Sequence, residues 1–180
     1  MLAQLRGEAH AKSAEAKRVT TGAYELHADG QDFRSPVSYR IAHPGERLRR
    51  LHEGEAFRQL ASELAGLSME PSKVGYLYYD AGDRIGLHTD LPECQLVLLA
   101  AIESTAPPLV VHPELKDLTP EELARLAENT AGAPDGGISI PLDDTSLVAL
   151  LGGGLPHQTR PVAAGSEAVV ATLCYVGSRV

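Results

Sequence analysis

The stretch YLYYDAGDRIGLHTDLPEC, from Tyr76 to Cys94, decides how the rest of the chain is interpreted. It begins with β-forming residues, turns through 80–83 and returns to an extended segment that carries His88 and Asp90. Residues i and i+2 of a strand point to the same face of a sheet, so this imidazole and this carboxylate are expected to converge on one point. The stretch therefore predicts two ligands of a metal site on one extended element.

A third ligand is expected from His157, which follows an apolar run at 146–151, three glycines and a Leu-Pro pair. Two histidines and one carboxylate on one face of a metal are typical of non-haem iron(II) oxygenases. Three protein ligands leave positions on an octahedral ion for a cosubstrate and for dioxygen. A His-x-Asp pair alone often occurs by chance, and the second histidine after a glycine-rich turn strengthens the prediction.

These motifs carry a family resemblance over roughly residues 73–177. The quoted elements, in chain order, are Tyr79-x-x-Gly82-x-x-Ile85-x-x-His88-x-Asp90, Gly154-Leu155-Pro156-His157 and Pro161-Val162-x-x-Gly165. This ordered set resembles the core of the iron(II) and 2-oxoglutarate-dependent oxygenases, in particular the small prolyl-hydroxylase-like and nucleic-acid-demethylase-like members. The resemblance implies that His88, Asp90 and His157 bind Fe(II), and that Tyr79 donates a hydrogen bond to the distal carboxylate of 2-oxoglutarate.

One position departs from this family's pattern. Where the family usually has an Arg or Lys that pairs with the distal carboxylate of 2-oxoglutarate, this chain has Glu167. A carboxylate facing a carboxylate is repulsive, so either another cation substitutes or 2-oxoglutarate is not the cosubstrate. Arg160 is the first candidate, because a guanidinium offers paired donors that match a carboxylate. Arg40 is the reserve, and Arg34 is a further candidate of the same rank.

Composition limits the class of protein and the class of partner. The chain has 180 residues, 43% of them hydrophobic, which is enough for one domain with a real core. Its formal net charge is -8 and its calculated pI is about 5.3. Binding to nucleic acid needs clustered Lys and Arg, so a nucleic-acid partner is not expected. The charge and size favour a small molecule or an amino-acid derivative as substrate.

The compartment is inferred from the cysteines and from the lack of targeting signals. Cys94 and Cys174 lie far apart without a C-x-x-C spacing, and free buried thiols are expected. No apolar run suits a signal peptide or a membrane span. We therefore expect a cytoplasmic protein with no membrane partner.

Hydrophobic periodicity and turn residues predict a mainly β fold with flanking helices, best described as a double-stranded β-helix of the jelly-roll or cupin type. We expect a single domain over 1–180. Residues 1–70 would support the core with helices and short strands, and residues 73–177 would form the jelly roll.

The expected N-terminal elements are a helix at 2–17, strands at 20–27 and 36–42, and a helix at 46–64. The sequence Thr119-Pro120-Glu121-Glu122 predicts a capped helix at 119–129, inserted between strands and followed by a strand at 138–142.

The other histidines are interpreted without a metal role. His10, His27, His43 and His52 are expected to be surface or helix-capping histidines, because none is paired with another ligating residue. His112 is a weak ligand candidate, since it directly precedes a proline. The predicted site is therefore the single triad.

The function expected from the triad is that of a non-haem iron dioxygenase that uses 2-oxoglutarate and dioxygen to hydroxylate or otherwise oxidise a small molecule. Two alternatives stay open. One is an iron oxygenase or oxidase that does not use 2-oxoglutarate, which the glutamate at 167 suggests. The other is a cupin-like metal-dependent non-redox enzyme or binding protein, for which Glu93 or Asp80 could act as a base. Substrate identity and oligomeric state are left open.

Overall fold

The computed structural model describes residues 2–20, 35–102, 106–130 and 134–178, and these residues form two antiparallel sheets. The larger sheet has the strand order β1-β2-β3-β10-β5-β8, with β4 paired to β2. Its strands are β1 (Lys17–Thr20), β2 (Val37–Ala42), β3 (Met69–Tyr79), β4 (Arg84–Ile85), β5 (Leu96–Ala101), β8 (Leu147–Leu150) and β10 (Ala168–Gly177). The smaller sheet has the order β7-β6-β9 and consists of β6 (Leu109–Val111), β7 (Ile138–Ile140) and β9 (His157–Thr159).

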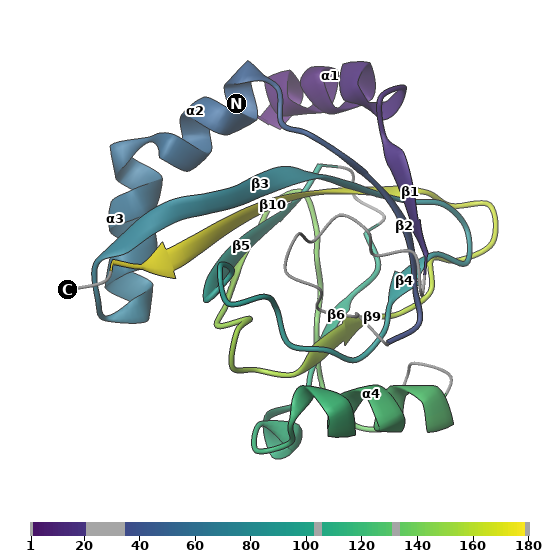
Figure 1. Ribbon diagram of the computed structural model, residues 1–180. Helices are drawn as coiled ribbons and strands as arrows, with labels where there is room; N and C mark the ends of the chain where they lie inside the picture. Colours follow the sequence, from purple (N-terminus) through teal and green to yellow (C-terminus); the bar gives the residue numbers. More distant parts are fainter. Residues whose placement is uncertain (1, 21–34, 103–105, 131–133, 179–180) are drawn as a thin grey trace.

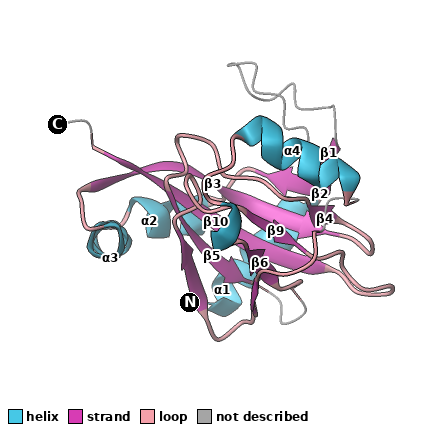
Figure 2. Cartoon of the chain, turned by 90° about the horizontal axis from the view of Figure 1, so that it is seen from below, coloured by secondary structure: helices cyan, strands magenta, loops and turns pink. Residues whose placement is uncertain are grey.

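Helices cover the outer face of each sheet. Helices α1 (Leu2–Ser13), α2 (Glu46–Glu53) and α3 (Glu55–Ala65) lie on the large sheet, and α4 (Pro120–Asn129) lies on the far side of the small sheet (Figure 1). A short 3-10 helix, η1 (Pro113–Leu115), precedes α4. Helices α2 and α3 sit at one end of the large sheet and β4 at the other, which both views show (Figure 2). None of the described helices is long and apolar enough to cross a membrane.

Side chains along the long strands point alternately to the two faces of the large sheet, and each face packs in a different apolar layer. On β3, Tyr76 and Tyr78 belong to the core under the helices, while Tyr79 belongs to the core between the sheets. Strand β10 repeats the pattern, because Leu173 faces the helix side and Val170 faces inward. Side chains two apart on a strand share a face, so a single strand contributes to both layers. The double-stranded β-helix predicted from the sequence is confirmed.

The helical predictions are confirmed with shifted boundaries. The helix expected at 2–17 ends at Ser13, and the one expected at 46–64 is divided into α2 and α3 by Gly54, whose backbone is extended. Helix α4 has the predicted capping box, in which Thr119 accepts from the backbone of Glu122 and the Glu122 side chain accepts from the backbone of Thr119. Of the two early strands, the one at 36–42 is β2, whereas 21–27 lie outside the described residues.

The prediction of free thiols is wrong, because Cys94 and Cys174 form a disulfide with a Cα–Cα distance of 4.7 Å. Cys174 lies on β10 opposite Val97 of β5, and Cys94 lies just before β5 begins. The antiparallel pairing of these strands brings together two residues that the sequence separates by 80 positions. Disulfides persist in oxidising environments, so the cysteines no longer support the expectation of a cytoplasmic protein.

Candidate metal centre

His88 and His157 lie directly opposite one another on neighbouring extended segments. The backbone N–H of His88 donates to the carbonyl of His157 at 3.0 Å, and the N–H of His157 donates to the carbonyl of His88 at 2.8 Å. His157 begins β9, whereas His88 forms an isolated bridge beyond the end of β4. The expected strand at His88 is therefore reduced to one paired residue. That residue is enough to place the two rings with their centroids 4.2 Å apart.

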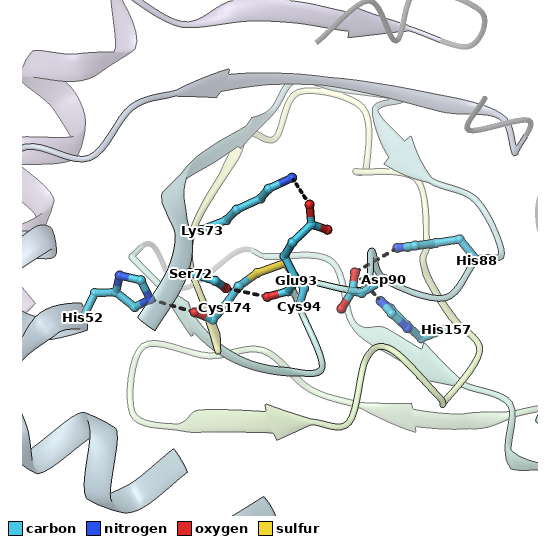
Figure 3. The surroundings of a disulfide bond; sticks show 9 residues. All are labelled: His52, Ser72, Lys73, His88, Asp90, Glu93, Cys94, His157 and Cys174. Atoms are coloured by element: carbon cyan, nitrogen blue, oxygen red, sulfur yellow. Dashed lines mark hydrogen bonds and ion pairs between the residues drawn. A yellow bond between two sulfur atoms is a disulfide. The ribbon is translucent and has the colours of Figure 1, made fainter. Parts of the chain in front are cut away.

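Asp90 completes the group from the same segment as His88. Its Oδ1 lies 3.5 Å from Nε2 of His88 and 3.7 Å from Nε2 of His157. One ligating atom from each of the three residues lies within 4.8 Å of the other two, so a single ion can contact all three (Figure 3). Among the described residues, this is the group of histidine and carboxylate side chains with metal-binding geometry. The triad predicted from the sequence is thus brought together.

Backbone carbonyls orient both imidazoles toward the carboxylate. Nδ1 of His88 lies 2.7 Å from the carbonyl oxygen of Gly86, and Nδ1 of His157 lies 2.9 Å from that of Leu155. A carbonyl oxygen can only accept, so each Nδ1 carries a proton, and in the neutral form of either imidazole the lone pair is on Nε2. A metal-ligating histidine usually donates its second N–H in this way, which fixes the tautomer and the ring orientation.

Burial and mutual interaction set the protonation state of the triad. Burial, together with the neighbouring His88, lowers the pKa of His157 to about 4. Burial alone would raise the pKa of Asp90, but interactions with His157 and His88 outweigh it and hold that pKa below its ordinary value. At neutral pH the site therefore presents an ionised carboxylate and a neutral His157 imidazole. These are the forms that bind a cation without first losing a proton.

The donor atoms open into a cavity between the two sheets. Apolar residues from β3, β5, β6 and β10 form most of its wall, and three hydroxyls interrupt them. The residues that line it are Leu77, Tyr79, Ile85, His88, Asp90, Val97, Leu99, Pro107, Leu109, Leu142, His157, Thr159, Val170 and Thr172. Besides the triad, Tyr79, Thr159 and Thr172 are the hydroxyl-bearing residues of this lining. Thr159 also accepts a 2.8 Å hydrogen bond from the backbone N–H of Ile85.

The structure brings Tyr79 to this cavity but not the predicted cations. Arg160 is exposed and is not among the lining residues, because it follows the buried β9 residues and lies outside the sheet pairing. Arg40 pairs with Asp80 at 3.1 Å and lies over the ring of Tyr78, on the helix-covered face of the sheet. Arg34 is outside the described residues. The described lining of the cavity contains no Lys or Arg.

The glutamate at 167 does not face the cavity as the family pattern suggested. Glu167 is exposed and borders a separate hollow with Arg40 and Asp80. The next residue, Ala168, pairs with Tyr79 and packs in the core between the sheets. The repulsion expected between Glu167 and a cosubstrate carboxylate therefore does not arise. The side chain opposite Tyr79 on the neighbouring strand is the methyl group of Ala168.

Neither acidic residue considered as a general base lies in the cavity. Asp80 is paired with Arg18 and Arg40, and Glu93 is paired with Lys73 at 3.6 Å. Both carboxylates are absent from the described lining. The cupin-like non-redox alternative therefore loses the two carboxylates that were considered as its general base.

The other described histidines take different positions from one another. His10 and His43 are exposed as predicted, and His27 is outside the described residues. The prediction for His52 is wrong, because it is buried and its Nε2 lies 2.7 Å from the carbonyl oxygen of Cys174. His112 is also buried, and its two ring nitrogens lie within hydrogen-bond distance of Gln158 and Glu114.

Sequence reasoning did not single out Thr159 or Thr172 as part of the site. The signal for Thr159 was its position two residues after His157, since alternate residues of a strand share a face. Thr172 is two residues from both Val170 and Cys174 on β10, which is the same signal. Gly152 is a third residue that was missed, and its role depends on a contact that the sequence does not reveal.

The fold and the triad can be compared with those of known proteins. Neither a family model nor a curated protein matches the sequence. The non-heme alpha-ketoglutarate-dependent epimerase SnoN from nogalamycin biosynthesis is 16% identical with a TM-score of 0.69, and the match covers 98% of this chain and 73% of that one. HygX from Streptomyces hygroscopicus, solved with nickel, 2-oxoglutarate and hygromycin B, is 14% identical with a TM-score of 0.63 and coverages of 97% and 79%.

A prolyl-4-hydroxylase from Pseudomonas putida matches in the same way. It is 15% identical with a TM-score of 0.59, and the match covers 99% of this chain and 86% of that one. At these identities the likeness establishes a shared fold. The resemblance recognised in the sequence motifs is thus confirmed in three dimensions, for the double-stranded β-helix common to iron and 2-oxoglutarate oxygenases.

Proposed function

We propose that this chain is an iron(II)-dependent oxygenase that uses 2-oxoglutarate as cosubstrate and oxidises a small molecule, with hydroxylation as the expected outcome. The observation that carries the proposal is the donor set. Two imidazole Nε2 atoms and one carboxylate oxygen converge in the lining of a mainly apolar cavity. Two histidines and one carboxylate with open positions for other ligands are the donor set of non-haem iron(II) oxygenases.

The residues present fit an iron ion. Oδ2 of Asp90 is buried and has no hydrogen-bond partner, and Oδ1 faces both imidazoles. A buried carboxylate without compensating donors is costly, and a bound cation would offset that cost. When bound, the iron with its oxo acid and dioxygen would supply the oxidising chemistry, while the protein supplies orientation and exclusion of water.

The chain's own residues would then divide the remaining tasks. Tyr79, Thr159 and Thr172 provide hydroxyl donors for a cosubstrate carboxylate, and a hydrogen bond to a charged group contributes roughly 1.5–3 kcal/mol. The aliphatic walls at Leu99 and Val170 keep water from the reacting atoms. We assign the substrate to small molecules because the chain is acidic, and because HygX, which shares its fold, is described with hygromycin B bound.

An anaerobic titration tests this proposal. The parent protein is expected to bind one Fe(II) per chain and to develop a weak visible charge-transfer band when 2-oxoglutarate is added. His88→Ala and His157→Ala should lose iron binding, whereas His43→Ala, which changes an exposed histidine outside the site, should keep it.

Each outcome of the titration has a separate meaning. Iron retained at one per chain in both triad variants would refute the assignment of the ligands. Iron bound without any band on addition of 2-oxoglutarate would refute the cosubstrate and indicate an iron enzyme that does not use it. Oxygen-dependent release of succinate over a panel of free amino acids and other small molecules then identifies the substrate class.

A further inference from the structure

The backbone of Gly152 touches the metal-ligand carboxylate directly. Gly152 is buried in the turn that follows β8, and its carbonyl oxygen accepts a 2.8 Å hydrogen bond from the backbone N–H of Asp90. A Cβ atom built on Gly152 would lie 1.8 Å from Oδ2 of Asp90 and 2.7 Å from its Cγ. The carboxylate therefore occupies the volume that any side chain at 152 would need.

The backbone conformation of Gly152 does not itself require glycine. The described glycines with positive φ are Gly66, Gly82, Gly136, Gly137 and Gly165, and Gly152 is not one of them. An alanine can adopt a backbone with negative φ without strain. The reason for glycine at this position is therefore the contact with Asp90 and not the shape of the turn.

The contact determines which oxygen of Asp90 is available for a ligand. Oδ2 is packed against Gly152 and has no hydrogen-bond partner, while Oδ1 points to the two imidazoles. A methyl group at 152 would displace the carboxylate, since the end of a side chain moves more readily than two backbone segments held by a hydrogen bond. Oδ1 would then move relative to Nε2 of His88 and of His157.

We propose that Gly152 is a positioning residue for the metal centre, because its missing side chain leaves the space that holds the Asp90 carboxylate against both histidines. This inference rests on the proposed function for the identity of the metal. The contact itself does not depend on any metal, and it can be tested in the metal-free protein.

The same turn offers a matched control. Gly154 also has no positive φ, and a Cβ atom there would meet no atom within 4 Å. Gly154→Ala makes the same chemical change two residues away, at an exposed position and without the collision. A difference between Gly152→Ala and Gly154→Ala therefore reports the contact with Asp90 and not a general effect of stiffening the glycine run.

The first experiment measures metal binding and not turnover. Co(II) is titrated into the metal-free parent and both variants, followed by calorimetry and by the visible absorption of bound cobalt. We expect Gly154→Ala to bind within about twofold of the parent and Gly152→Ala to bind at least tenfold more weakly, with an altered cobalt spectrum. Equal affinity and an unchanged spectrum for Gly152→Ala would overturn the inference.

A double-mutant comparison keeps the inference falsifiable if Gly152→Ala folds poorly. In the metal-free protein, Gly152→Ala should lower the thermal midpoint of the parent, but it should lower that of Asp90→Ala much less, because the colliding carboxylate is gone and only the 3.1 Å approach to the Cβ at position 90 remains. An equal loss in both backgrounds would refute the contact. Failure of the parent to bind Co(II) or Fe(II) would count against the proposed function alone, since the metal-free comparison would still decide the role of Gly152.

Discussion

Removal of the Cys94–Cys174 disulfide should cost this protein a large part of its stability. The two cysteines are separated by 80 positions, and the chain-entropy relation for a closed loop of about 80 residues gives about 4.5 kcal/mol at 25 °C. Typical domains are stable by only about 5–15 kcal/mol, so this single bond represents a substantial share. Both sulfurs are buried in the core between the sheets, where the reduced thiols would remain packed.

Equilibrium unfolding in guanidinium chloride, with and without reductant, measures this contribution. The oxidised parent should show no free thiol after denaturation, and reduction should lower its free energy of unfolding by about 3–4.5 kcal/mol. A Cys94→Ala/Cys174→Ala variant is the control, because reductant should not change its unfolding. Two free thiols in the denatured, unreduced parent, or unfolding of the parent that is insensitive to reductant, would refute the reasoning.

Three further predictions concern the site, the pH dependence of stability and a helix cap. Tyr79→Phe should raise the apparent 2-oxoglutarate constant about tenfold, equivalent to about 1.4 kcal/mol, whereas Arg160→Ala, which changes an exposed side chain, should leave it unchanged; steady-state succinate release distinguishes them. Burial would raise the pKa of Asp83, but hydrogen bonds, first from Arg18, hold it below its ordinary value, so its stabilising contribution is present at neutral pH and is lost as the pH falls below about 4. Asp83→Asn should therefore destabilise the protein by about 2 kcal/mol at pH 7, because Asp83 loses charged hydrogen bonds while its partner Arg18 stays solvated, and much less at about pH 2; an equal loss at both pH values in urea unfolding would contradict this. Thr119→Ala should cost about 1 kcal/mol by removing the capping box of α4, and a thermal midpoint equal to that of the parent would show that the cap is dispensable.

The sequence alone was sufficient for the parts of this protein that depend on neighbouring residues. The capping box at Thr119 is a local motif, and its helix begins where the motif predicts. The spacing of His88 and Asp90 fixes their relative orientation on any extended segment. His157 could be recognised because it follows a glycine-rich turn in a pattern shared with a known family. These signals were enough to predict the double-stranded β-helix and the metal triad.

Tertiary structure decided the features that depend on how distant strands are paired. The register of β10 against β5 brings Cys174 to Cys94, and the same strand turns Ala168 toward Tyr79 and leaves Glu167 outside. One residue of shift in a strand reverses which side chains face inward, so the sequence pattern around 167 could not determine the wall of the cavity.

The contact between Gly152 and Asp90 is another feature that the sequence could not predict. A glycine run in a sequence indicates a turn, but it does not reveal what lies against each glycine. Only the approach of the β8 turn to the segment after His88 shows that a Cβ at 152 would meet a carboxylate oxygen and one at 154 would meet nothing. Neighbouring residues determine local motifs such as a helix cap or a pair of ligands on one segment. The space available to a metal ligand depends on segments that meet only in the folded chain.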